Sequence, residues 1–273
     1  MADVHNGLSD KTTRPVFLVD GRVYQAYASY IRRILVGLTG TAQASALVCP
    51  PAINPEAILC PSVDQIEHPA LRLPVFRLQN RRILLDRLNR FKPTVLHAFY
   101  PGQVHLAQWL ARQLDIPYVV TVHCQTPRWR PPSHPLHRAA ALIAPSEAIA
   151  DHLRHKHAGF GDRIRRIRVG SFVEDNCCCF SRDNEIPSLI AVHPLDDAAV
   201  FKPFLNAVRH VMLDGYDLMV AVMGKGRKEK AIRRQIRSLG LTAVVTVVPP
   251  MRPVRAILSG ADIYLHLADT GCF

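Results

Sequence analysis

Short apolar runs alternate with amphipathic stretches along most of the chain. The runs hold few polar residues, and the stretches between them repeat their apolar residues with helical spacing. Runs that are apolar throughout are typical of strands buried on both faces, and the helical spacing is typical of helices that cover a sheet. Up to residue 171 the pattern predicts strands at 15–19, 45–50, 94–99, 118–123, 141–146 and 166–171, and helices at 24–38, 77–91, 102–114 and 146–157.

The pattern stops at residues 172–187, "FVEDNCCCFSRDNEIP", and then resumes. It next predicts strands at 188–193, 217–226, 243–248 and 262–267, and helices at 200–213, 227–239 and 253–261. Strands and helices that alternate in this way form parallel sheets with helices on both faces. The sequence therefore predicts an α/β protein with two Rossmann-like parallel-sheet domains. Its parts are a disordered leader (1–14), a first domain (15–171), a linker (172–187) and a second domain (188–273), incomplete because no helix follows its last strand.

The composition supports a folded protein and excludes several other classes. Of 273 residues, 48% are apolar and 21% are charged, which suits a sizeable core and excludes a disordered chain. No apolar run is long enough to span a membrane, and the leader lacks the apolar core of a signal peptide. We therefore expect a cytoplasmic protein. Its cysteines are expected to be thiols, and without a CxxC pair the run Cys177, Cys178 and Cys179 does not predict a metal site.

The net charge of +12 predicts an anionic partner, because the arginines are clustered. Helix 77–91 carries arginines around the apolar residues Leu84, Leu85 and Leu88, and "RIRRIR" at 163–168 adds four more. Such faces attract the phosphates of lipids, nucleic acids or small molecules. We expect helix 77–91 to contact an anionic membrane surface, which would place the protein peripherally at the inner face of the membrane.

Ligands of a parallel sheet bind at the carboxyl ends of its strands. Four residues end or directly follow a predicted strand and carry no long apolar side chain: Gly21, His97, His123 and Ser146. For His123 the alternative is a polar residue satisfied at a strand end, and for Ser146 it is a simple helix N-cap.

Three stretches, taken in order, resemble the retaining, nucleotide-sugar-dependent glycosyltransferases of family 4. They are "KPTVLHAFYPGQVHLAQWLARQLDIPYVVTVHCQTP", "AAALIAPSEAIADHLRHKHAGFGDRIRRIRVGS" and "DLMVAVMGKGRKEKAIRRQIRSLGLTAVVTVV". The resemblance runs from about residue 16 to 273. It implies the GT-B fold, a nucleotide-diphosphate sugar as donor, and an acceptor that is a sugar, a lipid-linked group or a phosphorylated molecule. It also implies catalysis without a metal or other cofactor, in which cations and helix N-termini hold the developing phosphate charge.

The candidate site has seven residues. The resemblance matches five of them position by position, and Lys202 and Lys225 are added as replacements for cations that the family has and this chain lacks. His123 matches the family's strand-end histidine near the reacting centre, and Gly21 matches its N-terminal glycine turn, although the family often has two glycines there. The implied set comprises His123 as the catalytic residue, Gly21 and Ser146 on the acceptor side, and Gly224, Lys225, Gly226 and Lys202 on the donor side.

The donor site departs from the family pattern at two positions. Pro194 stands where the family has the phosphate-binding arginine, and Ala199 stands where it has the lysine. Lys202, one helical turn further on, and Lys225, on the neighbouring turn, are the cations that would replace them. The family's first donor-site glutamate falls at Asp269 or Thr270, and the second would lie beyond the last residue.

Three interpretations remain open at this point. The first is a glycosyltransferase whose sequence is truncated at the C-terminus, inside its donor site. The second is a catalytically inactive binding or scaffold protein with the same fold, which Pro194 and Ala199 favour. The third, a nucleic-acid-binding protein, depends on the net charge alone and lacks interleaved aromatic residues, so we do not expect a nucleic-acid partner.

Overall fold

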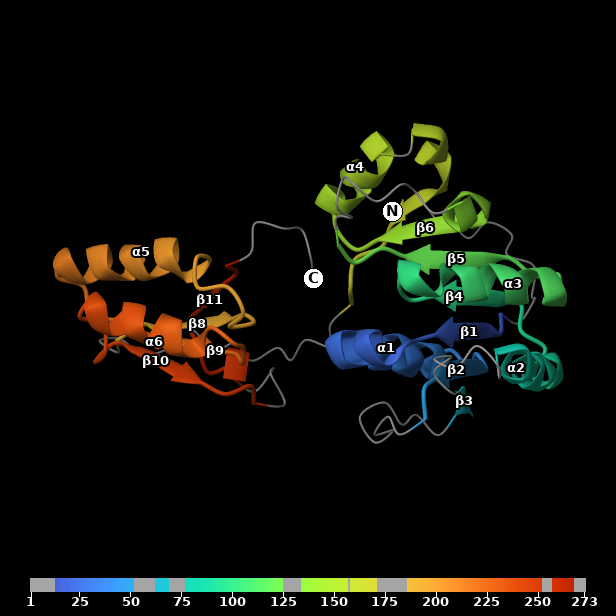
Figure 1. Ribbon diagram of the computed structural model, residues 1–273, viewed down its shortest axis with the longest axis horizontal. Coiled ribbons are helices and arrows are strands. Elements are labelled where there is room, and N and C mark those ends of the chain that lie inside the picture. Colours follow the sequence, from blue (N-terminus) through green and yellow to red (C-terminus); the bar gives the residue numbers. More distant parts are fainter. Residues whose placement is uncertain are drawn as a thin grey trace, which may run out of the picture. The chain divides into compact units, whose positions relative to one another are not determined.

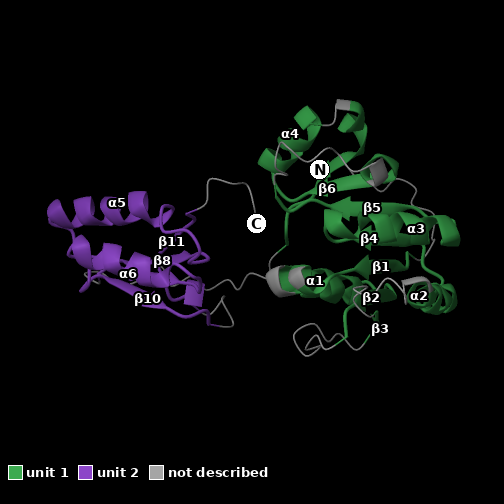
Figure 2. Ribbon diagram, viewed as in Figure 1, with its two compact units in different colours: residues 1–172, 271–273 green, residues 173–270 purple. Residues whose placement is uncertain are grey.

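The computed structural model describes residues 13–51, 62–68, 77–124, 134–156, 158–170, 186–251 and 257–267. These residues form two compact units, one ending at residue 170 and the other beginning at residue 186 (Figure 2). Most of the predicted leader (1–12) and linker (171–185) lies outside the described residues, and so do Cys177–179, Asp269 and Thr270.

Unit 1 is built on a seven-stranded sheet in which every pair of neighbouring strands is parallel (Figure 1). The spatial order is β3-β2-β1-β4-β5-β6-β7. The strands are β1 (Pro15–Leu18), β2 (Ser45–Cys49), β3 (Val63–Glu67), β4 (Val95–Ala98), β5 (Tyr118–Thr121), β6 (Ala141–Ala144) and β7 (Ile164–Arg166). The helices are α1 (Gly21–Gly40), α2 (Arg77–Phe91), α3 (Val104–Leu114) and α4 (Glu147–Lys156), with short 3₁₀ turns η3 (Pro101–Gln103), η4 (His134–Arg138) and η5 (Ala158–Arg163).

Helices cover both faces of this sheet, which explains why its central strands are apolar throughout. In β1, Val16 and Leu18 pack into a core with α2, α3 and α4, whereas Phe17 packs into a second core with α1. Side chains therefore alternate between two buried environments along one strand. His97 and His123 lie in aromatic contact with Phe99, a member of the α1 core.

Unit 2 holds a four-stranded parallel sheet in the order β10-β9-β8-β11. Its strands are β8 (Ser188–Val192), β9 (Met219–Met223), β10 (Val245–Val248) and β11 (Ile263–Leu265), and its helices are α5 (Phe201–Leu213) and α6 (Glu229–Ser238). Both helices contribute to one apolar core with the sheet. β11 is one of the two edge strands of this sheet, and its Tyr264 is 51% exposed. Two parallel α/β sheets confirm the predicted fold class.

Three elements differ from the prediction. β3 was missed because "VDQIE" is an edge strand whose charged Asp64 and Glu67 are exposed, so it shows no apolar run. β7 covers Ile164–Arg166 rather than 166–171, since only Ile164 is buried there. The helix after β1 begins at Gly21 rather than residue 24, because Asp20 caps it. Of the predicted helix 253–261, residues 252–256 lie outside the described part.

In the described parts of both units, no helix combines the length and the apolar character that crossing a bilayer requires.

Candidate functional site

The turns after β1 and β4 are tied together at the carboxyl edge of the unit 1 sheet. Asp20 Oδ1 accepts a hydrogen bond of 2.8 Å from the Val23 amide, which is an N-cap of α1. Its Oδ2 accepts one of 3.2 Å from Gln103 Nε2, in the turn after β4. Gly21, the first residue of α1, faces open space, since a Cβ placed on it would meet no atom within 4 Å. The packing of the described residues therefore does not require glycine at this position.

His123 follows β5 and is fully buried at this edge. Its Nε2 lies 2.9 Å from the carbonyl oxygen of Phe99. Because a carbonyl can only accept, Nε2 must carry the proton and donate it, so Nδ1 holds the lone pair. Nδ1 is buried and has no hydrogen-bond partner among the described residues. The site therefore contains an unused hydrogen-bond acceptor at the end of a central strand.

Two tyrosines of α1 cover His123. The ring of Tyr27 stacks on the imidazole with 4.0 Å between centroids and 22° between planes, and Tyr30 meets it edge-on at 5.7 Å. Tyr27 has non-helical backbone angles (φ −123°, ψ 18°), which kink α1 at the residue that contacts His123. The sequence did not indicate this role, because Tyr27 fits the apolar stripe of an ordinary helix. Tyr27 contacts His123, which is far away in the sequence, so the contact appears only in the folded structure.

His97 lies inside the neighbouring strand β4, and its side chain is hydrogen-bonded inside the protein. Its Nε2 and Thr121 Oγ1 share a hydrogen bond of 2.7 Å, and its ring packs against Phe17 and Phe99. Burial lowers the pKa of His97 to about 3, with a further contribution from the nearby His123. Burial also lowers the pKa of His123 to about 4, although the bond to Phe99 opposes this. Both histidines are neutral at physiological pH.

These lowered pKa values predict that acid destabilises unit 1. The unfolded chain protonates both histidines near pH 6.5, whereas the folded chain resists until about pH 3 to 4, so the free energy of unfolding falls as pH drops below 6.5. At pH 5 the expected loss is about 2 kcal/mol for each histidine relative to pH 7. Urea unfolding followed by tryptophan fluorescence at both pH values measures it. Equal stability at the two pH values would contradict the prediction. It would also be contradicted if the double variant His97→Phe/His123→Phe lost as much free energy of unfolding between pH 7 and pH 5 as the wild type.

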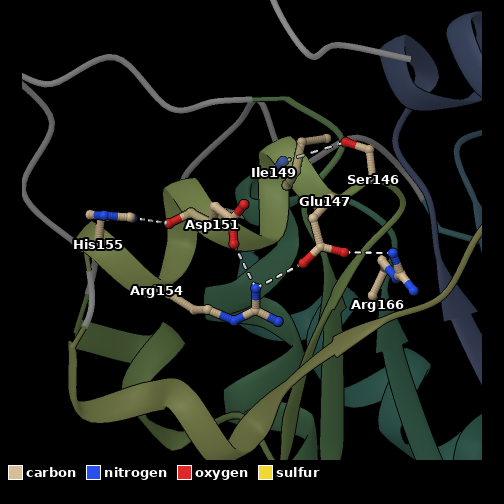
Figure 3. Close-up of polar contacts among 7 residues, drawn as sticks. All are labelled: Ser146, Glu147, Ile149, Asp151, Arg154, His155 and Arg166. Carbon is tan, nitrogen blue, oxygen red and sulfur yellow. Dashed lines mark hydrogen bonds and ion pairs between the residues drawn. The ribbon is translucent and has the colours of Figure 1, made fainter.

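Ser146 acts as a helix cap in this structure, as Figure 3 shows. Its Oγ accepts a hydrogen bond of 3.4 Å from the Ile149 amide at the start of α4. The neighbouring Glu147 pairs with Arg154 at 3.0 Å and with Arg166 of β7 at 2.6 Å. Arg166, one of the clustered arginines of 163–168, is thus paired within the protein. The side chains of this network are about half exposed, so the ion pairs contribute little individually.

Gly224 and Gly226 allow two loops at the carboxyl edge of the unit 2 sheet to pack closely. A Cβ on Gly224 would lie 2.1 Å from the carbonyl oxygen of His193, and a Cβ on Gly226 would lie 2.2 Å from the carbonyl carbon of Leu195. The Leu195 amide donates to the Lys225 carbonyl at 3.2 Å. The Gly-x-Gly turn after β9 therefore positions the loop after β8, where the family pattern has its phosphate ligands.

Cations gather around these two loops. Lys225 lies between the two glycines, and Lys202 lies in the first turn of α5; both are exposed. Arg227, which the sequence reasoning missed, donates its amide to Asp196 Oδ1 at 3.0 Å, and its Nε lies 3.7 Å from the same oxygen. Its position depends on the loop packing, which no motif reveals. Among the described residues, no group of His, Cys, Asp and Glu side chains has the arrangement of a metal site.

Pro194 and Ala199 are exposed in the loop after β8. The Ala199 amide donates to Asp197 Oδ1 at 2.8 Å, so the loop is closed by its own side chains. Neither residue offers a cation to a diphosphate.

Comparison with known proteins gives this geometry a family. The model of Glycosyltransferase Family 4 matches residues 28–170, which is more than half of the chain. The chain belongs to glycosyltransferase family 4. No curated protein matches its sequence significantly.

Several solved structures share the fold of this chain at low sequence identity. A glycosyltransferase from Rickettsia africae ESF-5 is 13% identical with a TM-score of 0.70, and the match covers 93% of this chain and 72% of that one. The Anabaena protein Alr3699/HepE in complex with UDP and glucose is 11% identical with a TM-score of 0.68, covering 92% and 73%. The lipopolysaccharide outer core galactosyltransferase WaaB is 10% identical with a TM-score of 0.68, covering 90% and 70%. At such identities the likeness shows the GT-B fold alone.

Proposed function

We propose that this family 4 protein transfers a sugar from a nucleotide-diphosphate sugar to an acceptor with retention of configuration. The donor would bind at the carboxyl edge of the unit 2 sheet, and the acceptor at the carboxyl edge of the unit 1 sheet. Family membership supports the reaction class. A structure of Alr3699/HepE with UDP-glucose supports the donor class.

The observation that carries the proposal is the unused Nδ1 of His123. An acceptor atom with no partner is costly to bury, and such atoms in native structures often serve a function. With a pKa of about 4, His123 is a weak base, so we infer that it accepts a hydrogen bond from a sugar hydroxyl rather than removing a proton. Because Nδ1 is buried and Tyr27 covers the ring, Tyr27 must shift before a hydroxyl reaches it, and the kink in α1 is where this shift would occur.

On the donor side we assign Lys202 and Lys225 to the diphosphate, with Gly224 and Gly226 shaping the turn that carries Lys225. The backbone amides at the start of α5 add partial positive charge. No metal or other cofactor is assigned a role. Gly21 and Ser146 are assigned to the acceptor side, Gly21 through the open space in front of it. The acceptor is proposed to be a sugar, a lipid-linked group or a phosphorylated molecule.

We also propose that the protein works in the cytoplasm, peripherally bound to the inner face of the membrane through α2. Arg82, Arg87 and Arg90 of this helix are exposed beside Ile83, which is 48% exposed although it is apolar. Basic and apolar side chains together favour binding to anionic lipid surfaces.

The direct test is to incubate the chain with UDP-glucose, UDP-galactose, UDP-N-acetylglucosamine or GDP-mannose and a simple sugar acceptor. We expect nucleotide diphosphate to be released with one donor, and NMR of the product should show the anomeric configuration of that donor. Inversion would contradict retention. If the chain binds a nucleotide sugar but forms no nucleotide diphosphate from it, the result supports the second candidate, an inactive binding protein. Pro194 and Ala199 favour that candidate.

A further inference from the structure

A hollow of about 420 Å³ lies between the edge strand β3 and helix α2 of unit 1. Three arginines line it: Arg14, which precedes β1, and Arg87 and Arg90 near the end of α2. Because α2 leads into β4 and Arg14 leads into β1, this hollow lies at the amino edge of the sheet. His123 lies at the opposite, carboxyl edge. The hollow is therefore separate from the proposed acceptor site.

Arg14 is held in place before any ligand arrives. Its amide donates to Thr94 Oγ1 at 2.8 Å, and its carbonyl accepts from the Thr94 amide at 3.0 Å. Its guanidinium lies over the ring of Phe91, 4.7 Å from the centroid. Its Nε is buried and has no hydrogen-bond partner in the part of the chain that the structure describes. An arginine fixed at backbone and side chain loses little entropy when it binds an anion.

Arg87 and Arg90 are one helical turn apart and so lie on the same face of α2. Asp64 is the carboxylate that lines this hollow, and no ion pair joins it to any of the three arginines within the described residues. Three arginines thus share this hollow with one carboxylate, and among the described residues no ion pair neutralises them. Charges of one sign that share a hollow repel one another. An anion with several oxygens would relieve this repulsion.

We propose that Arg14, Arg87 and Arg90 form a binding site for a phosphoryl group. Guanidinium groups bind phosphate oxygens through two parallel hydrogen bonds, and three of them match the oxygens of a phosphate monoester or diester. The phosphoryl group belongs either to a lipid headgroup or to a soluble metabolite. The site does not depend on the proposed transfer reaction, and it goes beyond general attraction between a basic helix and a membrane because it requires three particular side chains.

The test uses the full chain and glycerol 3-phosphate as the probe, with binding measured by calorimetry at low ionic strength. We expect saturable binding that weakens about tenfold or more in Arg90→Gln and in Arg14→Gln. Arg112→Gln is the matched control, because Arg112 is an exposed arginine of α3 that lies outside the residues lining the hollow and outside the helix proposed to contact the membrane. It removes the same charge and should leave the affinity within about twofold.

Vesicles identify the source of the phosphoryl group. A lipid headgroup is indicated if the chain binds phosphatidylglycerol vesicles but not phosphatidylcholine vesicles. This binding should weaken in Arg90→Gln and not in Arg112→Gln. Binding of glycerol 3-phosphate without such vesicle binding indicates a soluble ligand. The proposal is overturned if the wild-type chain shows no saturable binding, or if Arg112→Gln weakens binding as much as Arg90→Gln. Unchanged thermal unfolding in Arg90→Gln shows that the loss is not due to misfolding.

Discussion

Replacing Gly226 by alanine is expected to destabilise unit 2 by about 3 kcal/mol or more. The added Cβ would lie 2.2 Å from the carbonyl carbon of Leu195 and 2.7 Å from the Asp196 amide nitrogen. These are backbone atoms, which cannot rotate away, so the two loops must separate. Moving the two loops apart would break the hydrogen bond of 2.8 Å that the Lys228 amide donates to the Leu195 carbonyl. Donor binding should be lost together with the packing.

The two units can be followed separately during unfolding. Both tryptophans, Trp109 and Trp129, precede the end of unit 1 at residue 170, so tryptophan fluorescence reports on unit 1, whereas far-UV circular dichroism reports on both units. In Gly226→Ala, part of the dichroism should be lost at lower urea concentration while the fluorescence midpoint stays unchanged. Lys225→Ala and Gly21→Ala are the controls, since Lys225 is exposed and Gly21 faces open space. A Gly226→Ala protein as stable as these controls would show that the loop packing is wrong.

His123→Phe is expected to lower the rate of sugar transfer about 100-fold or more. Phenylalanine keeps a ring that can stack on Tyr27 but removes both nitrogens, including the Nδ1 that we propose contacts a sugar hydroxyl. The Phe99 carbonyl loses its donor, which should cost about 1–3 kcal/mol of stability. Steady-state kinetics with the preferred donor, together with urea unfolding, separates the two effects.

His97→Phe is the matched control for this experiment. It makes the same exchange on the neighbouring strand and leaves Thr121 Oγ1 without its partner, so it should cost a similar amount of stability. The Nε2 of His97 is already hydrogen-bonded inside the protein, so we do not expect it to contact substrate. The His97→Phe variant should therefore transfer sugar at a rate within about threefold of wild type. If His97→Phe and His123→Phe lose transfer equally, the effect is structural. If neither loses it, our placement of the site is wrong.

The sequence was most informative where burial is strongest. β1 and β2 place residues in both apolar cores of unit 1, so their apolar runs are visible without a structure. The helix predicted at 77–91 has the same bounds as α2. By contrast, β3 has one exposed edge and two exposed charges, and its pattern resembles that of a loop.

The candidate site could be predicted only in part, because the sequence shows where a residue stands along the chain but not which distant residues it contacts in the fold. The strand-end rule indicated His123, but its protonated nitrogen follows from the carbonyl of Phe99, 24 residues away in sequence. Tyr27 stacks on the His123 ring at a kink in α1, and the spacing of apolar residues in the sequence does not reveal this kink. The Gly-x-Gly motif could be recognised in the sequence. The reason for its two glycines could not, because it is the close packing of the loop after β8 against them.

The central claim is that a nucleotide-sugar donor binds at the carboxyl edge of the unit 2 sheet. The most direct measurement is a titration of the isotope-labelled full chain with UDP, followed through its backbone amide resonances. We expect saturable shifts at His193, Leu195, Asp196 and residues 224–228, and their loss in Gly226→Ala. Shifts confined to unit 1, or no shifts at millimolar UDP, would contradict the claim.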